Sequence, residues 1–157
     1  MIDRERLAAL AAEEPSRSGV YRNRFATPRH GLGAFLRWQW DTRGRFPRHQ
    51  SFPLQQPDAR RLANPGPHPQ LTWIGHSTFL FQHRGWNLIT DPVFSERCSP
   101  LPFAGPKRAV PPAITIDKLP AINAVLVSHN HYDHLDRASV KQLQARFGRE
   151  ILWFVPT

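Results

Sequence analysis

Cysteine and long apolar runs are nearly absent from this chain of 157 residues. The single cysteine, Cys98, excludes a disulfide scaffold and a cysteine-rich zinc finger, because both need several thiols. No apolar run approaches the roughly 18 residues that a membrane-spanning helix requires. The first residues, Met1–Glu14, are charged at both ends and have no apolar core, so they do not resemble a secretory signal. We therefore expect a cytoplasmic location and leave contact with a membrane surface open.

Acidic residues are also scarce, because 21 Lys and Arg stand against 12 Asp and Glu, a formal charge of +9. The excess is concentrated between Pro15 and Arg61, where ten Arg, two Asp and seven aromatic residues are found. We interpret residues 1–69 as an irregular basic leader, with a short helix at Asp3–Glu14 before its arginine-rich part. Arginine with interleaved tryptophan suits an anionic lipid interface as well as a phosphate backbone. A solvated charged face without a partner is the alternative.

The pattern of the sequence changes after Pro65–Pro69, a segment whose three prolines and one glycine disfavour helix and sheet. The elements predicted beyond it are three short strands, a buried strand, a helix and a last strand. They lie at Leu71–Gly75, Thr78–Gln82, Trp86–Thr90, Asn123–Val127, 136–148 and Ile151–Val155. Asp136 is a favourable N-cap for the helix, and Gly148 is a natural stop. This order predicts an α/β architecture for residues 70–157.

Four side chains that bind metals well follow the predicted buried strand, namely His129, His131, Asp133 and His134. Neutral imidazole is a ligand that zinc favours, and a carboxylate compensates its charge. His129 and His131 are two residues apart and face the same side of an extended loop. Asp133 and His134 diverge and are better placed to hold a second ion beside the first, as in two-metal sites. A chance cluster of surface histidines is the alternative.

The same loop carries a resemblance to a known family. Ser128–Leu135 resembles the signature loop of the metallo-β-lactamase superfamily. Leu71–Thr78, Leu88–Phe94 and Phe103–Arg108 are similar to its branch of N-acyl-phosphatidylethanolamine-hydrolysing phospholipase D and related Zn-dependent hydrolases. The leader tryptophans and Tyr21–Asn23 also resemble that branch. The resemblance covers nearly the whole chain after its first 20 or so residues.

This resemblance implies an αββα sandwich with two zinc ions in the complete domain. His129 and His131 would hold the first ion. Asp133 and His134, the expected catalytic residues, would hold the second ion. In the family, a metal-bridging hydroxide attacks the phosphodiester and releases phosphatidic acid.

Two further residues are candidates for supporting these ligands. His76 matches a family position beside the site and is a candidate donor, although a structural turn histidine is an equal alternative. Asp91 follows a predicted strand and is a candidate acceptor for the second N–H of a metal-bound histidine. A turn aspartate that ends the strand is the alternative reading of Asp91.

The family also uses a later histidine, a bridging aspartate and a final histidine. Beyond His134 the chain has no histidine, and its acidic residues there are Asp136 and Glu150. Each predicted ion therefore has about two ligands, whereas a catalytic zinc takes three and a water. We expect the N-terminal half of the sandwich, a truncated product or fragment with little activity of its own.

The predicted function is a zinc-dependent phosphodiesterase that acts on N-acyl phosphatidylethanolamine-type phospholipids or another phosphodiester. One alternative is a non-catalytic fragment that binds anionic membrane surfaces peripherally. Another is a nucleic-acid phosphodiesterase of the same superfamily, and we rank nucleic acid low because the flanking segments favour the lipid branch. The sequence does not give the oligomeric state.

Overall fold

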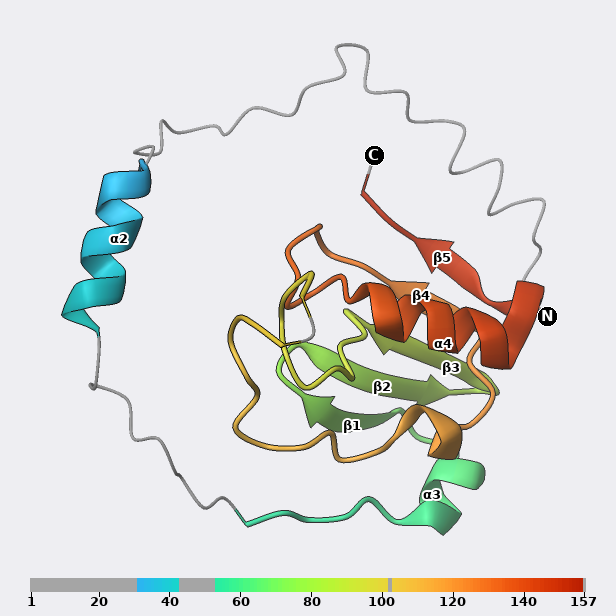
Figure 1. Cartoon of the computed structure of the whole chain (residues 1–157). Coiled ribbons are helices and arrows are strands. Elements are labelled where there is room, and N and C mark those ends of the chain that lie inside the picture. Colours follow the sequence, from blue (N-terminus) through green and yellow to red (C-terminus); the bar gives the residue numbers. More distant parts are fainter. Residues whose placement is uncertain (1–30, 43–52, 102, 157) are drawn as a thin grey trace, which may run out of the picture. The chain divides into compact units, whose positions relative to one another are not determined.

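The computed structural model describes residues 31–42, 53–101 and 103–156, and the chain divides into two compact units, Met1–Arg48 and His49–Thr157. In the first unit the described residues form the helix α2 (Leu32–Asp41), none of whose side chains is buried (Figure 1). Helix α2 differs from the irregular leader that the sequence predicts for residues 1–69. The helix predicted at Asp3–Glu14 lies outside the described residues.

The second unit contains a five-stranded mixed sheet in the order β1-β2-β3-β4-β5. Its strands are β1 (Gln70–Gly75), β2 (Thr78–His83), β3 (Trp86–Thr90), β4 (Ala124–Leu126) and β5 (Leu152–Phe154). The first three strands pair antiparallel, and β3, β4 and β5 pair parallel. All five predicted strands are therefore present, with β4 and β5 one residue shorter at each end. The α/β fold class is confirmed.

The two hairpins of the sheet depend on backbone conformations with positive φ. Between β2 and β3, Arg84 has φ 47° and Gly85 has φ 78°. A two-residue turn with both φ values positive matches the twist of the strands that it joins. Between β1 and β2, His76 has φ 50° and follows Gly75 at the end of β1. This turn places His76 at the end of the sheet where β1 ends.

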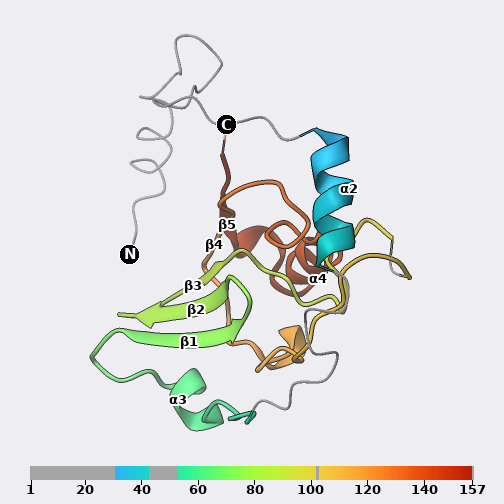
Figure 2. The same ribbon diagram turned by 90° about the vertical axis from the view of Figure 1, so that its left-hand side faces the viewer.

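The helix α4 (Arg137–Phe147) connects β4 to β5 and covers one face of the sheet (Figures 1 and 2). It begins where predicted, since the Asp136 side chain accepts a hydrogen bond from the backbone N–H of Ala138. It ends at Gly148, whose φ of 63° is a conformation that favours glycine. The remaining elements are the short helices α3 (Ala59–Ala63), η1 (Ile116–Lys118) and η2 (Gly148–Glu150).

The hydrophobic core lies between α4 and the covered face of the sheet. Leu80, Ile89, Val125 and Leu143 are completely buried there. Burial of each such side chain stabilises the fold by about 1.5–3 kcal/mol. Leu62 of α3 also belongs to this core, so residues 53–69 include an element of the second unit. The predicted division of the chain at residue 69 stays a prediction.

The opposite face of the sheet is apolar and exposed. Alternate residues of the strands point to it, and several are large and between 36% and 63% exposed. They are Leu71, Trp73, Phe81, Leu126 and Phe154. Nothing among the described residues covers this face, as expected for one layer of a sandwich.

Candidate metal centre

The predicted site residues lie at one end of the sheet. Asp91 directly follows β3, and the loop between β4 and α4 carries His129, His131, Asp133 and His134. These are the carboxyl ends of two parallel strands, where α/β proteins bind their ligands. His76 reaches the same end of the sheet through the turn between β1 and β2.

His76, Asp133 and His134 form a cluster that is able to hold a metal ion. One ligand atom from each lies within 4.8 Å of the others. The Nε2 atom of His76 is 3.1 Å from Oδ2 of Asp133, and the Nε2 atom of His134 is 3.6 Å from the same oxygen. Two imidazoles and a carboxylate are a donor set that zinc accepts. The residues therefore fit a zinc ion.

Asp91 contacts His134, one of the three residues of this cluster. Its side chain is 9% exposed, and its Oδ2 lies 3.0 Å from Nδ1 of His134. Because an ionised carboxylate only accepts hydrogen bonds, Nδ1 must carry the proton, which leaves the lone pair of Nε2 free for a metal. This is the contact that the supporting role predicted for Asp91 requires, and the role itself stays a prediction.

The loop also fixes the carboxylate of Asp91 in its ionised form. The backbone N–H of Ser128 donates to Oδ1 at 2.7 Å, and the Ser128 hydroxyl lies 2.9 Å from Oδ2. Burial raises the pKa of Asp91, but the hydrogen bonds from His134 and Ser128 outweigh burial, so the pKa lies below its usual value of 3.8. Asp91 is therefore charged at neutral pH and compensates positive charge at the site.

His129 and His131 form a second pair in the same loop. The Nε2 atom of His129 is 3.1 Å from Nδ1 of His131. Two nitrogens bound tetrahedrally to one zinc, each at about 2.05 Å, are about 3.3 Å apart, so the spacing of this pair also fits one ion. The rings of His129 and His134 have centroids 4.0 Å apart, which brings the pair next to the cluster.

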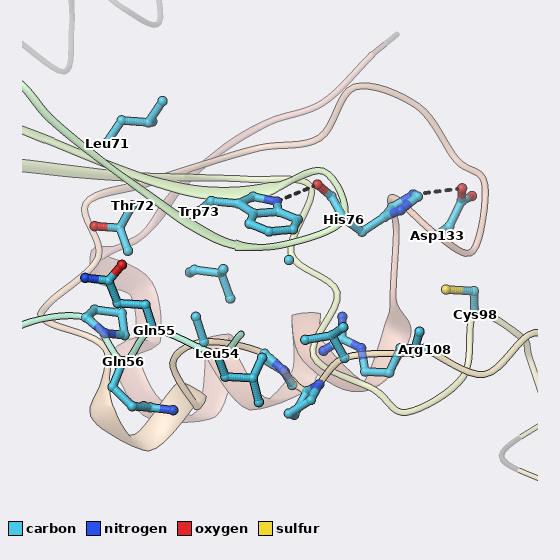
Figure 3. A pocket seen from close by; sticks show the side chains of 18 of the residues that line it. Leu54, Gln55, Gln56, Leu71, Thr72, Trp73, His76, Cys98, Arg108 and Asp133 are labelled. Atoms are coloured by element: carbon cyan, nitrogen blue, oxygen red, sulfur yellow. Dashed lines mark hydrogen bonds and ion pairs between the residues drawn. The ribbon is translucent and has the colours of Figure 1, made fainter. Parts of the chain in front are cut away.

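Hydrogen bonds at the turn between β1 and β2 hold His76 in place (Figure 3). The indole Nε1 of Trp73 donates to the backbone oxygen of His76 at 2.9 Å, and the Ser77 hydroxyl donates to the backbone oxygen of Asp133 at 3.4 Å. The positive φ of His76 is an uncommon backbone conformation of the kind that often occurs at functional sites. These contacts direct the imidazole toward Asp133.

His76 is thus a candidate ligand, whereas the sequence suggested only a supporting donor or a turn residue. Its position 57 residues before Asp133 gives no spacing signal that could identify it. The chain has four other histidines besides His76 and those of the loop. Of these, His68 and His83 are not part of the cluster, and His30 and His49 lie outside the described residues.

A groove of about 1320 Å³ opens beside the cluster and runs along the edge strand β1. His76 and Asp133 line one part of it, together with Cys98 and Arg108 (Figure 3). Apolar residues such as Trp73 and Leu54 line other parts. The groove therefore offers both polar and apolar surface to a ligand that approaches the cluster.

Comparison with known proteins identifies related sequences. The family model described as the beta-lactamase superfamily domain matches residues 70–151, more than half of the chain. An uncharacterized protein of Mycobacterium tuberculosis is 48% identical over 86 residues, which cover 55% of this chain and 21% of the relative. N-acyl-phosphatidylethanolamine-hydrolyzing phospholipase D 1 of Caenorhabditis elegans is 46% identical over 85 residues, which cover 54% of this chain and 24% of the relative. This chain therefore spans about a quarter or less of these curated relatives.

A solved structure is also similar to part of the chain. It is CmlA, a diiron beta-hydroxylase from Streptomyces venezuelae, with 26% identity and a TM-score of 0.41. The match covers 59% of this chain and 16% of CmlA.

Proposed function

Since the chain belongs to the beta-lactamase superfamily, we propose that it supplies part of a zinc-dependent phosphodiesterase acting on N-acyl phosphatidylethanolamine-type phospholipids. The observation that carries this proposal is the 46% identity to the phospholipase D of Caenorhabditis elegans. The residues that match the family domain, 70–151, contain the metal cluster.

The residues that would hold zinc are the cluster of His76, Asp133 and His134 together with the neighbouring pair of His129 and His131. Zinc bound there would lower the pKa of a water molecule and neutralise the charge that develops on a phosphodiester. The side chains of the chain contribute orientation. Asp91 fixes the tautomer of His134 through its contact with Nδ1.

Asp133 contributes a permanent negative charge beside two imidazoles. Burial raises its pKa, but a backbone hydrogen bond and the hydrogen bond from His76 outweigh burial, so the pKa lies below 3.8. The carboxylate is therefore ionised throughout the neutral range and ready to bind a cation without losing a proton. Its contact with His76 orders the turn between β1 and β2 against the loop.

A chimera with the relative tests the proposed reaction. The 85 matching residues of the Caenorhabditis elegans enzyme are replaced by those of this chain, and release of phosphatidic acid from N-acyl phosphatidylethanolamine vesicles is measured with added zinc. We expect the chimera to be active and an Asp133→Ala substitution in it to abolish turnover. The control is Asp117→Ala, which changes an exposed aspartate of η1 that lies within residues 70–151 and outside the cluster. This control should leave turnover unchanged.

Two results would decide against parts of this proposal. A folded, zinc-loaded chimera without activity on the lipid would contradict the substrate assignment. Activity of the present chain alone, abolished by Asp133→Ala, would show that its 157 residues suffice. We expect the chain alone to show little turnover, because the described residues leave an apolar sheet face open beside a partial ligand set.

We also propose that the basic leader contacts anionic membranes peripherally. The helix α2 supports this, since its apolar side chains Leu32, Phe35 and Leu36 recur at helical spacing and are at least 50% exposed. No helix in the described part of the chain is long and apolar enough to span a bilayer. An amphipathic helix beside arginines is typical of binding at the surface of anionic lipid.

Liposome co-sedimentation tests this contact. The chain is expected to bind vesicles with phosphatidylserine more strongly than neutral vesicles and to be released by high salt. A Phe35→Ser/Leu36→Ser variant of α2 should bind less, and Phe81→Ser on the sheet face serves as a control for general loss of apolar surface. Equal binding to both vesicle types at all salt concentrations would leave the arginines as an ordinary solvated surface.

A further inference from the structure

The segment between β3 and η1 contains a loop that is folded back on itself. The backbones of Arg97 and Lys107 form an isolated antiparallel β-bridge. The N–H of Cys98 donates to the backbone oxygen of Pro106 at 3.0 Å. The N–H of Arg108 donates to the backbone oxygen of Glu96 at 2.9 Å. These bonds fix the backbone of Arg108 at the point where the loop meets the groove.

The cationic side chains of this loop are satisfied to different degrees. Lys107 forms an exposed ion pair with Glu96, and Arg97 donates to the backbone oxygen of Gly105 at 2.7 Å. Arg108 donates from Nη2 to the backbone oxygen of Val93 at 3.1 Å. Its Nε and Nη1 atoms are buried and have no hydrogen-bond partner among the described residues. A guanidinium is always charged in proteins, so Arg108 holds a partly buried positive charge with unused donors.

Arg108 borders open space beside the metal cluster. It lines the groove together with His76, Cys98 and Asp133 (Figure 3). A Cβ atom placed on Gly75 would lie 3.8 Å from Nη2 of Arg108 and would meet no other atom within 4 Å. The guanidinium is therefore next to the turn that carries His76, and the absence of a side chain on Gly75 leaves room there.

Among the described residues, no carboxylate forms an ion pair with Arg108. Asp136 attracts the guanidinium electrostatically, but its carboxylate accepts hydrogen bonds from Ser95, Ala138 and Ser139 instead. Unused donors of a charged side chain beside a groove are suited to bind an anion from outside the chain. Guanidinium donors match the oxygens of a phosphate group, to which arginine binds in a two-pronged geometry.

We propose that Arg108 binds an anionic phosphodiester oxygen and positions the phosphate beside the cluster of His76, Asp133 and His134. The class of ligand rests on the proposed function, whereas the residue is assigned by its unpaired donors and its place in the groove. Arg108 acts by binding and orienting the anion. Nε and Nη1 are buried in this structure, so binding requires the side chain to reorient toward the groove.

Anion titrations of the full chain test this assignment. Dibutyl phosphate, a phosphodiester anion, is titrated by calorimetry into the chain and into Arg108→Gln and Arg84→Gln variants. Arg84 is an exposed arginine of the turn between β2 and β3, so its substitution removes the same charge away from the groove. We expect affinity to fall about tenfold or more for Arg108→Gln, as for loss of a charge-assisted hydrogen bond, and less than twofold for Arg84→Gln.

Further arms identify the ligand. Neutral tributyl phosphate should bind equally to the chain and to Arg108→Gln, because it carries no negative charge. Inorganic phosphate should bind more weakly than dibutyl phosphate, and a preference for inorganic phosphate would overturn the diester assignment. Equal affinity of dibutyl phosphate for the chain and both variants would overturn the proposal.

Stability and zinc measurements separate this inference from its alternatives. Arg108→Met removes the two unpaired donors but also the hydrogen bond to the Val93 oxygen. The melting temperature should therefore fall by no more than one lost hydrogen bond accounts for, whereas anion affinity should fall clearly. A large fall in melting temperature with unchanged anion affinity would show that Arg108 is only structural. Dibutyl phosphate is also titrated after zinc is removed with a chelator. If dibutyl phosphate binds without zinc and this binding depends on Arg108, the inference is supported even if the loop fails to bind zinc. If the chain binds zinc normally but substitution of Arg108 does not change the affinity for dibutyl phosphate, only this inference is contradicted, and the proposed function is not.

Discussion

Substitution of Asp91 by asparagine tests how the cluster is oriented. In the native chain, Oδ1 of Asp91 accepts the N–H of Ser128, and Oδ2 lies close to the Ser128 hydroxyl and to Nδ1 of His134. In Asp91→Asn the amide oxygen keeps the contact with the Ser128 N–H, which places the NH₂ group against Nδ1 of His134. An NH₂ group donates, so Nδ1 must become the acceptor and the proton moves to Nε2. The nitrogen that faces Asp133 then no longer offers a lone pair.

The expected magnitude follows from this change of tautomer. Loss of a carboxylate that orients a metal-binding histidine costs about 10–100-fold in metal affinity, which is about 1.4–2.7 kcal/mol. The fold should survive, because the hydrogen bond to the Ser128 N–H remains. Loss of the charge at this buried position should lower the free energy of unfolding by about 1–2 kcal/mol.

Competition with a chromophoric chelator measures the zinc affinity of the native chain and of the variant, and urea unfolding measures stability. Asp117→Asn is the matched control, since Asp117 is exposed in η1 and does not contact the cluster. We expect unchanged zinc affinity for Asp117→Asn and a clear loss for Asp91→Asn. Equal affinities of all three proteins, with intact circular dichroism spectra, would refute the reasoning that Asp91 orients a ligand.

Three further predictions concern the stability of the fold. Gln82→Leu should lower the free energy of unfolding, measured in urea, by about 1–3 kcal/mol, because the buried amide of Gln82 forms hydrogen bonds with the Leu62 oxygen and with two other side chains. An unchanged urea midpoint would show that these hydrogen bonds do not stabilise the fold. Asp136→Ala should lower the free energy of unfolding in urea by about 1–3 kcal/mol, because it removes the helix cap and leaves the N–H groups of Ser95 and Ala138 without acceptors. The pKa values of Asp91, Asp133 and Asp136 are lowered in the fold, so their stabilisation is present above the usual value of 3.8 and is lost as pH falls below it. The melting temperature should therefore decline below about pH 4, and a flat profile down to pH 2 would contradict these pKa directions.

The local elements of the second unit could be predicted from the sequence by itself. The β-prone runs, the Arg84–Gly85 turn and the helix between Asp136 and Gly148 depend on side chains and backbone preferences within a few residues of one another. The same is true of the loop from His129 to His134, whose spacing and place after a buried strand predicted a metal site. The family also followed from these short segments, and the family model confirms it.

Other features depended on contacts between residues that are distant in sequence. His76 and Asp133 are 57 residues apart, and Asp91 and His134 are 43 apart, so only the pairing of β3 with β4 and the turn after β1 bring them together. The unpaired donors of Arg108 likewise depend on which groups the folded loop places around them. Sequence spacing fixes distances only along a continuous strand or helix, whereas these distances are set by how separate elements pack. The sequence by itself therefore determined the family and the candidate metal loop, and the tertiary structure decided that His76 and Asp91 lie beside that loop.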